Sequence, residues 1–214
     1  MDFVKQFATF LVKSNALKFG VFKLSSGKES PYYIDLRVLP SFPQYFKLAI
    51  DGYRDTLEKQ VGLKSLDYLC SVPTSGLVYA SALSYEIGKP FVYVRKEAKE
   101  HGTSKMIEGY LGSGAKVTMI DDVATTGKSI IEGVEAIRSN GGVVEHALVL
   151  IDRLEGAKEA LKTQGVKLLS VAKISEIASV LFESGMLEEN VLKAVQKQFK
   201  TSSKTRLRLN SRIS

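Results

Sequence analysis

The middle of this chain alternates short β-branched runs with amphipathic stretches, and this alternation restricts the possible folds more than any other feature. Five runs have the length and composition of β-strands: Leu66–Val72, Phe91–Val94, Lys116–Ile120, Val143–Ile151 and Val166–Val171. Three stretches between these runs have helical spacing: Leu77–Ile87, Lys128–Ser139 and Leu154–Thr163. Repeated strand–helix–strand units predict an α/β fold with a mostly parallel, twisted sheet flanked by helices.

The two ends of the chain differ from this middle part. Helical spacing returns in four flanking stretches: Asp2–Asn15, Pro43–Gln60, Ile174–Phe182 and Leu187–Phe199. A strand-like stretch rich in Gly, Ser and Pro, Val21–Leu39, separates the first two. We expect the flanks to cover the carboxyl edge of the sheet, where open α/β sheets bind ligands. The expected organisation is one domain over residues 1–199, made of an N-terminal hood (1–60), a core sheet (61–172) and C-terminal helices (173–199).

The formal net charge is +7, and the positive excess is concentrated at the C-terminal end. Residues 200–214 hold five basic residues and no acid, whereas the rest of the chain has 25 basic and 23 acidic residues. A terminal run of like charge is usually a flexible, solvated tail, so we do not expect a nucleic-acid partner. The start of the chain lacks the apolar core of a signal peptide, no apolar run suits a membrane span, and Cys70 is the one cysteine. We therefore expect a cytoplasmic protein without a membrane partner.

The stretch from residue 117 to residue 129 carries the most specific chemical signal. An apolar strand leads into Asp121 and Asp122, and a helix is expected from Lys128. Free N–H groups at a helix N-terminus bind phosphate, nearby Thr and Ser hydroxyls add donors, and Gly127 lets the backbone approach an anion closely. Adjacent carboxylates accept hydrogen bonds from vicinal hydroxyls and suit a nearby cation. The stretch thus offers a phosphate site beside a ribose site.

Two other nucleotide-binding motifs are excluded here, and a purely structural interpretation is weighed against the ligand site. A P-loop ending at Ser129 would need glycine at position 122, which is aspartate. A dinucleotide motif beginning at Gly112 would have to follow a strand, but it precedes one. The structural interpretation is that the two acids only cap a turn. Two consecutive acids followed by Thr-Thr-Gly favour the ligand site.

This stretch resembles the motif with which type I phosphoribosyltransferases bind 5-phosphoribosyl 1-diphosphate (PRPP), in which two acids lead into a Thr-x-Gly phosphate loop. The resemblance implies that Asp121 and Asp122 hold the ribose hydroxyls and take part in catalysis. It also implies that PRPP, chiefly its 5′-phosphate, is bound by the residues that follow: Val123, Ala124, Thr125, Thr126, Gly127, Lys128 and Ser129.

A second segment, residues 95–105, is rich in cationic side chains and taken alone is a solvated charged loop. Its sequence Arg-Lys-Glu-Ala-Lys-x-His-Gly is similar to the mobile catalytic loop of orotate phosphoribosyltransferases, in which cations stabilise the departing pyrophosphate. The resemblance implies a homodimer in which this loop reaches the neighbouring subunit. It implies catalytic roles for Lys99 and His101, and PRPP contacts from Arg95, Lys96, Lys99 and His101.

A third segment, Leu24–Tyr33, is similar to the hood of the same family. Tyr33 and Ile34 align with a pair that contacts orotate, although some members have an aromatic residue in place of the isoleucine. The family places an arginine after the strand that ends at Ile151, and Arg153 stands there. A guanidinium fork suits the orotate carboxylate, and Thr125 is implied to contact orotate as well. The alternative for the tyrosines is simple packing on the sheet.

Two departures from the family pattern concern positive charge. Many members have Tyr-Lys where this chain has Thr74-Ser75, and some have lysine where it has Ser25. Backbone groups of Thr74 and Ser75 still suit pyrophosphate, but one cation is missing. PRPP binding is therefore expected to rely more on the mobile loop and on Mg²⁺.

The resemblance predicts an orotate phosphoribosyltransferase that joins orotate to the ribose 5-phosphate of PRPP in UMP biosynthesis. Mg²⁺ is expected to be held mainly by PRPP, and no protein ligand is assigned to it. Two alternatives stay open: a purine phosphoribosyltransferase, which needs no carboxylate receptor, and a PRPP-binding regulator that binds nucleic acid through the basic tail. The near-neutral body of the chain and the intact loop lysines disfavour the regulator.

Overall fold

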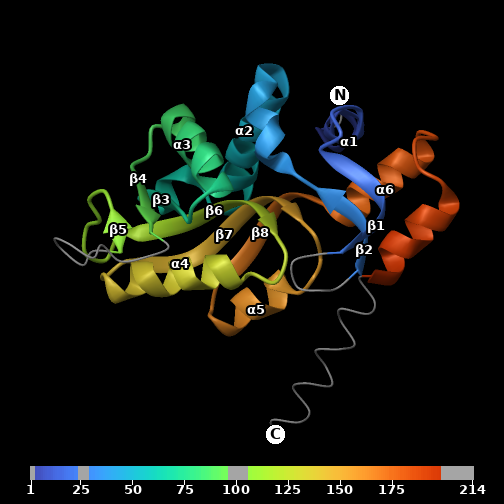
Figure 1. Ribbon diagram of the computed structural model, residues 1–214. Coiled ribbons are helices and arrows are strands. Elements are labelled where there is room, and N and C mark those ends of the chain that lie inside the picture. The colour runs from blue at the N-terminus through green and yellow to red at the C-terminus, as the bar shows by residue number, and fades with distance from the viewer. Residues whose placement is uncertain (1–2, 24–28, 96–105, 199–214) are drawn as a thin grey trace, which may run out of the picture.

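The computed structural model describes residues 3–23, 29–95 and 106–198. It confirms the α/β fold: a six-stranded sheet with helices on both faces, in which every strand but one edge strand runs parallel (Figure 1). In spatial order the strands are β5 (Ile107–Glu108), β4 (Phe91–Val94), β3 (Tyr68–Ser71), β6 (Lys116–Ala124), β7 (Val143–Asp152) and β8 (Lys167–Lys173). The short strand β5, which is antiparallel to β4, is the exception.

Two hydrophobic clusters, one on each face of the sheet, hold the layers together. The larger cluster joins the sheet to α1 (Phe3–Lys13), α2 (Pro43–Gln60), α3 (Ser75–Ile87) and α6 (Ile174–Glu183). The smaller joins it to α4 (Lys128–Ser139) and α5 (Ala157–Thr163), on the opposite face (Figure 1). Within β7, Leu148 belongs to the first cluster and Val149 to the second, because successive side chains of a strand point to opposite faces.

An antiparallel hairpin, β1 (Leu17–Lys23) with β2 (Glu29–Ile34), lies beside α1 and α6 (Figure 1). It continues through the short helix η1 (Leu36–Ser41) into α2, and η2 (Leu63–Ser65) leads into β3. A helical segment, 189–198, follows α6. Because Ser30 Oγ donates to Gln198 Oε1 at 3.3 Å, the hairpin and the end of that segment meet.

Strand β6 is longer than the sequence indicated. The prediction ended it at Ile120, but its pairing with β7 continues to Ala124, which lies opposite Asp152. Asp121 and Asp122 are therefore the sixth and seventh residues of the strand and do not lie in a loop beyond it. Rigid strand geometry, and not a turn, sets where the two carboxylates point.

Most other predicted elements have bounds close to those observed, and α2, α4 and β4 agree at both ends. Helix α5 begins at Ala157, three residues later than predicted, because Leu154 and Gly156 have left-handed backbone angles, with φ of 58° and 102°. The two-residue strand β5 was not predicted, since it is too short to show a hydrophobic pattern.

Several predictions fall outside the described residues: Ser25, the catalytic-loop residues Lys96, Lys99 and His101, and the basic tail. The roles assigned to them stay predictions. Within residues 3–23, 29–95 and 106–198, each helix is too short or too polar to cross a lipid bilayer.

Candidate active site

Asp121 and Asp122 lie near the carboxyl end of β6, where three elements fix their positions. From the first turn of α3, Ser75 Oγ donates to Asp122 Oδ1 at 3.0 Å. The N–H of Asp122 donates to Asp121 Oδ1 at 3.0 Å, and from α2 the Tyr53 hydroxyl donates to the main-chain oxygen of Asp121 at 2.6 Å. The two carboxylates are thus held before any ligand arrives.

Gly76 allows α3 to approach the acids this closely. A Cβ at this position would lie 2.6 Å from Asp121 Oδ1 and 2.5 Å from Ser71 Oγ, well inside van der Waals contact. Any side chain here would push the helix away from β6. The sequence analysis did not assign Gly76 a role, although a glycine just inside a helix start is a usable signal.

Asp121 holds a proton more readily than an ordinary aspartate does. Burial raises the pKa of Asp121 well above its ordinary value, and the neighbouring Asp122 raises it further. The N–H of Asp122 and the hydroxyl of Ser129 act in the opposite direction. A carboxyl that keeps its proton can donate a hydrogen bond, so the pair suits vicinal hydroxyls that both donate and accept.

Two helix N-termini flank the acids. Helix α3 begins at Ser75 and α4 at Lys128, and neither cap residue, Thr74 or Gly127, makes a side-chain capping bond. Uncapped first-turn N–H groups attract anions, and the helix dipole strengthens the attraction. The left-handed backbone of Gly127, with φ of 81°, aims the loop into α4.

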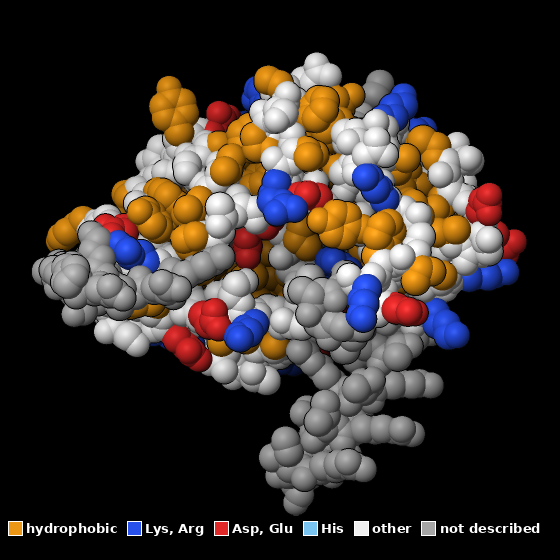
Figure 2. All heavy atoms as spheres, viewed as in Figure 1, with side chains coloured by type: hydrophobic (Ala, Val, Ile, Leu, Met, Phe, Trp, Pro, Cys, Tyr) orange, Lys and Arg blue, Asp and Glu red, His pale blue; other side chains and the backbone are white. Residues whose placement is uncertain are grey.

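Two adjoining cavities surround these groups. The first, about 350 Å³, is lined by Thr74, Ser75 and Ser129 together with both acids. The second, about 290 Å³, extends from Asp122 towards Ile34, Thr125 and Arg153. Figure 2 shows this face, where acidic and basic side chains adjoin one another near its centre. A third hollow of about 390 Å³, between α1 and α6, contains one ionisable side chain, Glu176, which is bound to Lys173.

Arg153, just beyond β7, is buried and held by groups from distant parts of the chain. Its Nη2 lies 2.8 Å from Glu155 Oε1, and its guanidinium carbon lies 4.7 Å from the centre of the Tyr32 ring. Its Nε donates to the Tyr32 hydroxyl at 3.2 Å, and Nη2 donates to Ser30 Oγ at 3.4 Å. Gln198 Nε2 in turn donates to Glu155 Oε1 at 2.9 Å. The arginine is therefore a fixed cation at the wall of the second cavity.

Comparison with known proteins decides between the families that share this architecture. A family model described as a phosphoribosyl transferase domain matches residues 49–180. An orotate phosphoribosyltransferase of Cenarchaeum symbiosum (strain A) is 47% identical over 196 residues, which cover 92% of this chain and 98% of that protein. The chain belongs to the orotate phosphoribosyltransferases. A second relative, from Sulfolobus acidocaldarius, is 44% identical over 91% of this chain and 94% of its own length.

A solved structure leads to the same family. The crystal structure of orotate phosphoribosyltransferase from Aeropyrum pernix superposes with a TM-score of 0.74 and is 40% identical, covering 85% of this chain and 99% of that one. The phosphoribosyltransferase fold predicted from the motifs is therefore confirmed. The purine-specific alternative is not favoured.

Most of the residues predicted for this phosphoribosyltransferase site lie together. Thr74, Ser75, Asp121, Asp122, Val123 and Ser129 line the first cavity. Ile34, Thr125 and Arg153 line the second. Ala124, Thr126, Gly127 and Lys128 continue the same segment without lining either cavity, and Lys128 is exposed beside Glu132.

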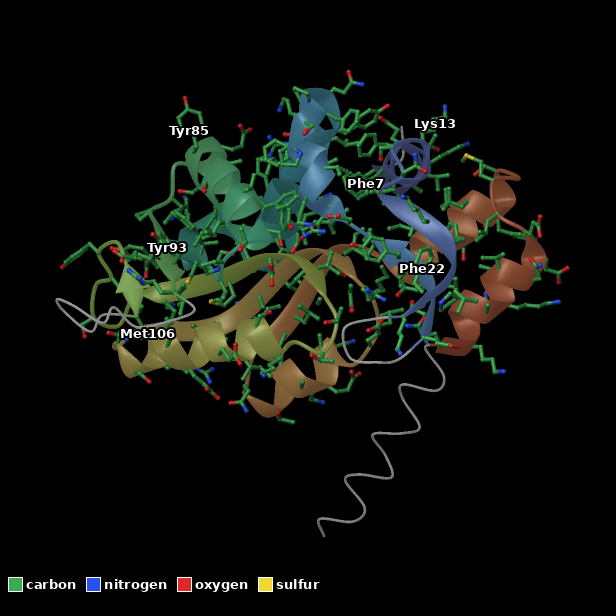
Figure 3. All side chains as sticks on the ribbon, in the orientation of Figure 1. Phe7, Lys13, Phe22, Tyr85, Tyr93 and Met106 are labelled. Carbon is green, nitrogen blue, oxygen red and sulfur yellow. The ribbon has the colours of Figure 1, made fainter. Side chains whose placement is uncertain are left out.

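Two further predicted residues, outside this segment, also lie away from the cavity walls. Arg95 is ion-paired with Glu108 at 3.0 Å, on the β4–β5 edge, at the described end of the catalytic-loop segment. Tyr33 is partly exposed, and its ring lies 5.7 Å from that of Phe22 on the hairpin (Figure 3). The buried tyrosine that touches Arg153 is its neighbour Tyr32, because successive residues of β2 face opposite sides.

The sequence analysis missed two groups of residues. Glu155 and Gln198 bind around Arg153, but they are separated from each other and from the hairpin by long stretches of chain. Arg37 lines both cavities, and its signal in the sequence was only that it follows the hood segment at Asp35-Leu36-Arg37.

Proposed function

We propose that this chain transfers the phosphoribosyl group of PRPP to orotate, giving orotidine 5′-monophosphate and pyrophosphate for UMP biosynthesis. One observation carries the proposal: a pair of carboxyl groups lies between two uncapped helix N-termini, beside a cavity walled by a buried arginine. This arrangement matches a ligand with a phosphate at one end, a diphosphate at the other and a ribose between them.

In this proposal each part of PRPP has its own place. The 5′-phosphate binds the segment 123–129 through the N–H groups at the start of α4 and the hydroxyls of Thr125, Thr126 and Ser129. Asp121 and Asp122 bind the ribose hydroxyls. The pyrophosphate binds the first turn of α3, at Thr74 and Ser75.

Orotate occupies the second cavity in this proposal. Its carboxylate pairs with Arg153, and Ile34 and Thr125 lie at the same wall. Tyr33, the neighbour of Ile34 in β2, is partly exposed and does not line the cavity, so its contact with orotate stays a prediction. The Glu155 carboxylate holds the buried guanidinium in position and compensates its charge.

The reaction itself exchanges one bond for another at C1′ of the ribose. N1 of orotate gives up its proton to the departing pyrophosphate or to water and forms the new C–N bond. The C–O bond to pyrophosphate breaks, and its bonding electrons leave with pyrophosphate. The site orients the two reactants and screens the negative charge of the leaving group. The groups that orient the reactants lie in the described site, and the catalytic loop and Mg²⁺ are proposed to add positive charge at the leaving group.

We propose Mg²⁺ as the cofactor, held mainly by the oxygens of PRPP. The donors beside the proposed site, the carboxylates of Asp121 and Asp122, are the hard oxygen groups that Mg²⁺ accepts. When bound, the metal ion neutralises charge on the pyrophosphate.

The catalytic loop remains part of the proposal. Lys99 and His101, with Arg95 and Lys96, are proposed to contact PRPP in the neighbouring subunit of a homodimer. The described base of this loop lies at the β4–β5 end of the sheet, with Tyr93 and Met106, far from the hairpin that carries Phe22 (Figure 3).

Two wider assignments are also proposed here. Residues 1–199 are taken as one phosphoribosyltransferase domain in the cytoplasm, with the hood (1–60) and C-terminal helices (173–199) flanking the core sheet. The tail 200–214 is assigned no binding function.

The test is loss of orotate absorbance on addition of the full chain to orotate, PRPP and Mg²⁺, with pyrophosphate release measured in parallel. We expect stoichiometric loss of orotate and release of pyrophosphate, and no release with hypoxanthine or adenine. Turnover of a purine base without turnover of orotate would contradict the proposal. PRPP binding without pyrophosphate release would instead favour the regulator.

A further inference from the structure

Arg37 borders both cavities of the site, and no other lysine or arginine among the described residues does so. The second cationic residue at these walls, Arg153, lines only the cavity assigned to orotate. Each arginine is paired with an acid, but the Arg153–Glu155 pair is buried, whereas the Arg37 side chain beside Asp35 is 68% exposed. We propose that Arg37 binds the pyrophosphate group of PRPP, a role that rests on the proposed function.

The charges around the first cavity make a cation necessary. Its described ionisable groups are two carboxyls, Asp121 and Asp122, and the Arg37 guanidinium. Thr74 and Ser75 offer pyrophosphate only neutral donors. A multiply charged anion next to carboxylates needs a compensating positive charge, and Arg37 is the described side chain that provides one.

Arg37 is oriented before a ligand binds. Asp35 Oδ1 accepts from its Nε at 2.7 Å, Asp35 Oδ2 accepts from its Nη2 at 2.7 Å, and Asp35 Oδ1 also accepts from its backbone N–H at 3.0 Å. The same Asp35 carboxylate caps the N-terminus of η1. The Arg37 guanidinium is therefore held in a fixed position relative to the backbone of the hood. This pairing holds the pKa of Asp35 below its ordinary value, so the clamp stays ionised at neutral pH.

The clamp leaves Arg37 able to bind an anion. A guanidinium has five N–H donors, and Asp35 uses two of them. The Arg37 side chain is 68% exposed, whereas that of Arg153 is 7% exposed. Tyr33 is a further close neighbour of the guanidinium. An exposed arginine held at a fixed angle suits a large polyanion that arrives from solvent.

Of the two candidate ligands, pyrophosphate suits Arg37 better than orotate does. Orotate presents one carboxylate, and Arg153 already lies at the wall of its cavity. Pyrophosphate carries several charges and lies, in the proposed pose, at Thr74 and Ser75 on the wall of the cavity that Arg37 borders. Arg37 therefore contributes to the binding of PRPP and to the departure of its leaving group.

The experiment compares Arg37→Gln, Arg37→Lys and wild type in the full chain. Losing a charge-assisted contact raises KM for PRPP and the inhibition constant of pyrophosphate by roughly tenfold in Arg37→Gln, with KM for orotate nearly unchanged. Arg37→Lys keeps the positive charge but loses the two-pronged guanidinium. Its KM for PRPP and its inhibition constant for pyrophosphate are therefore expected to lie between those of wild type and Arg37→Gln. Arg54→Gln is the matched control, since Arg54 is ion-paired with Asp51, Asp55 and Glu86 and lines neither cavity.

Titration calorimetry with inorganic pyrophosphate tests Arg37 without turnover. We expect weaker binding to Arg37→Gln than to wild type and to Arg54→Gln. Unchanged pyrophosphate binding in Arg37→Gln, or a rise confined to KM for orotate, would overturn the inference. A wild-type chain that binds pyrophosphate through Arg37 but does not consume orotate would contradict the proposed function and leave the Arg37 site supported.

Discussion

The proposed phosphate side and the proposed base side of this site are built in different ways. The phosphate side comes mainly from one continuous segment, residues 121–129, where a strand end, a short loop and a helix start supply the groups. The base side is gathered around Arg153 by Tyr32 and Ser30, more than 120 residues earlier in the chain, and by Gln198 through Glu155. A continuous segment carries its chemistry in its own sequence, whereas a gathered site depends on the packing of the whole fold.

The largest expected effect tests the phosphate side. Asp122→Asn removes a carboxylate that in the proposed pose accepts hydrogen bonds from the ribose. We expect kcat/KM for PRPP to fall about 10²-fold, as losing charge-assisted hydrogen bonds implies. Steady-state kinetics measures this fall in kcat/KM. Asp55→Asn is the control, because Asp55 is exposed and lines neither cavity. A near-normal kcat/KM would mean that the continuous segment does not hold the ribose.

The second prediction tests the base side through Glu155→Ala. This change leaves Arg153 buried without its counter-charge, and breaking a buried ion pair costs about 3 kcal/mol of stability. KM for orotate is expected to rise, because the guanidinium is no longer held in place, while pyrophosphate binding stays near wild type. Denaturant unfolding and kinetics measure the two effects. Glu159→Ala, on the exposed side of α5, is the control. Wild-type stability in Glu155→Ala would show that the pair does not order the base side.

The third prediction separates stability from function at Asp121. Its pKa is raised in the folded protein, so the folded state binds this proton more tightly than the unfolded chain does. Stability contributed by that proton is full at low pH and is lost as pH rises from about 4, the ordinary carboxyl pKa, through the raised value. Asp121→Asn should therefore gain stability over wild type as pH increases towards neutrality, while its activity falls. Melting temperatures at several pH values, with Asp55→Asn for reference, test this. A difference from wild type that does not change with pH would contradict it.

The smallest effect is expected at Gln198. It donates to Glu155 and accepts from Ser30, two residues that themselves contact Arg153. Gln198→Ala should cost about 1 kcal/mol or less and raise KM for orotate by no more than roughly twofold, as expected for one neutral hydrogen bond. Chemical unfolding and orotate titration measure both quantities. If Gln198→Ala lost as much stability as Glu155→Ala and raised KM for orotate as much, the 189–198 segment would be needed to hold Arg153 in place.

Local patterns in the sequence predicted the fold, and they identified the segment that is proposed to bind phosphate. The 2-residue and 3.6-residue periods identify strands and helices because they reflect which neighbours along the backbone share a face. The segment 121–129 was found for the same reason, since the acids, the glycine and the helix start are neighbours in sequence. Even there, only pairing with β7 decided that Asp121 and Asp122 belong to the strand.

What the sequence alone determined is thus the α/β architecture, the acids of β6 and the presence of an arginine after β7. The tertiary structure decided which groups surround that arginine, why Gly76 must lack a side chain, and that Arg37 stands between the two cavities. The physical reason is the range of the interactions: backbone periodicity is set within a few residues, whereas contacts between groups more than 100 residues apart exist only once the layers pack.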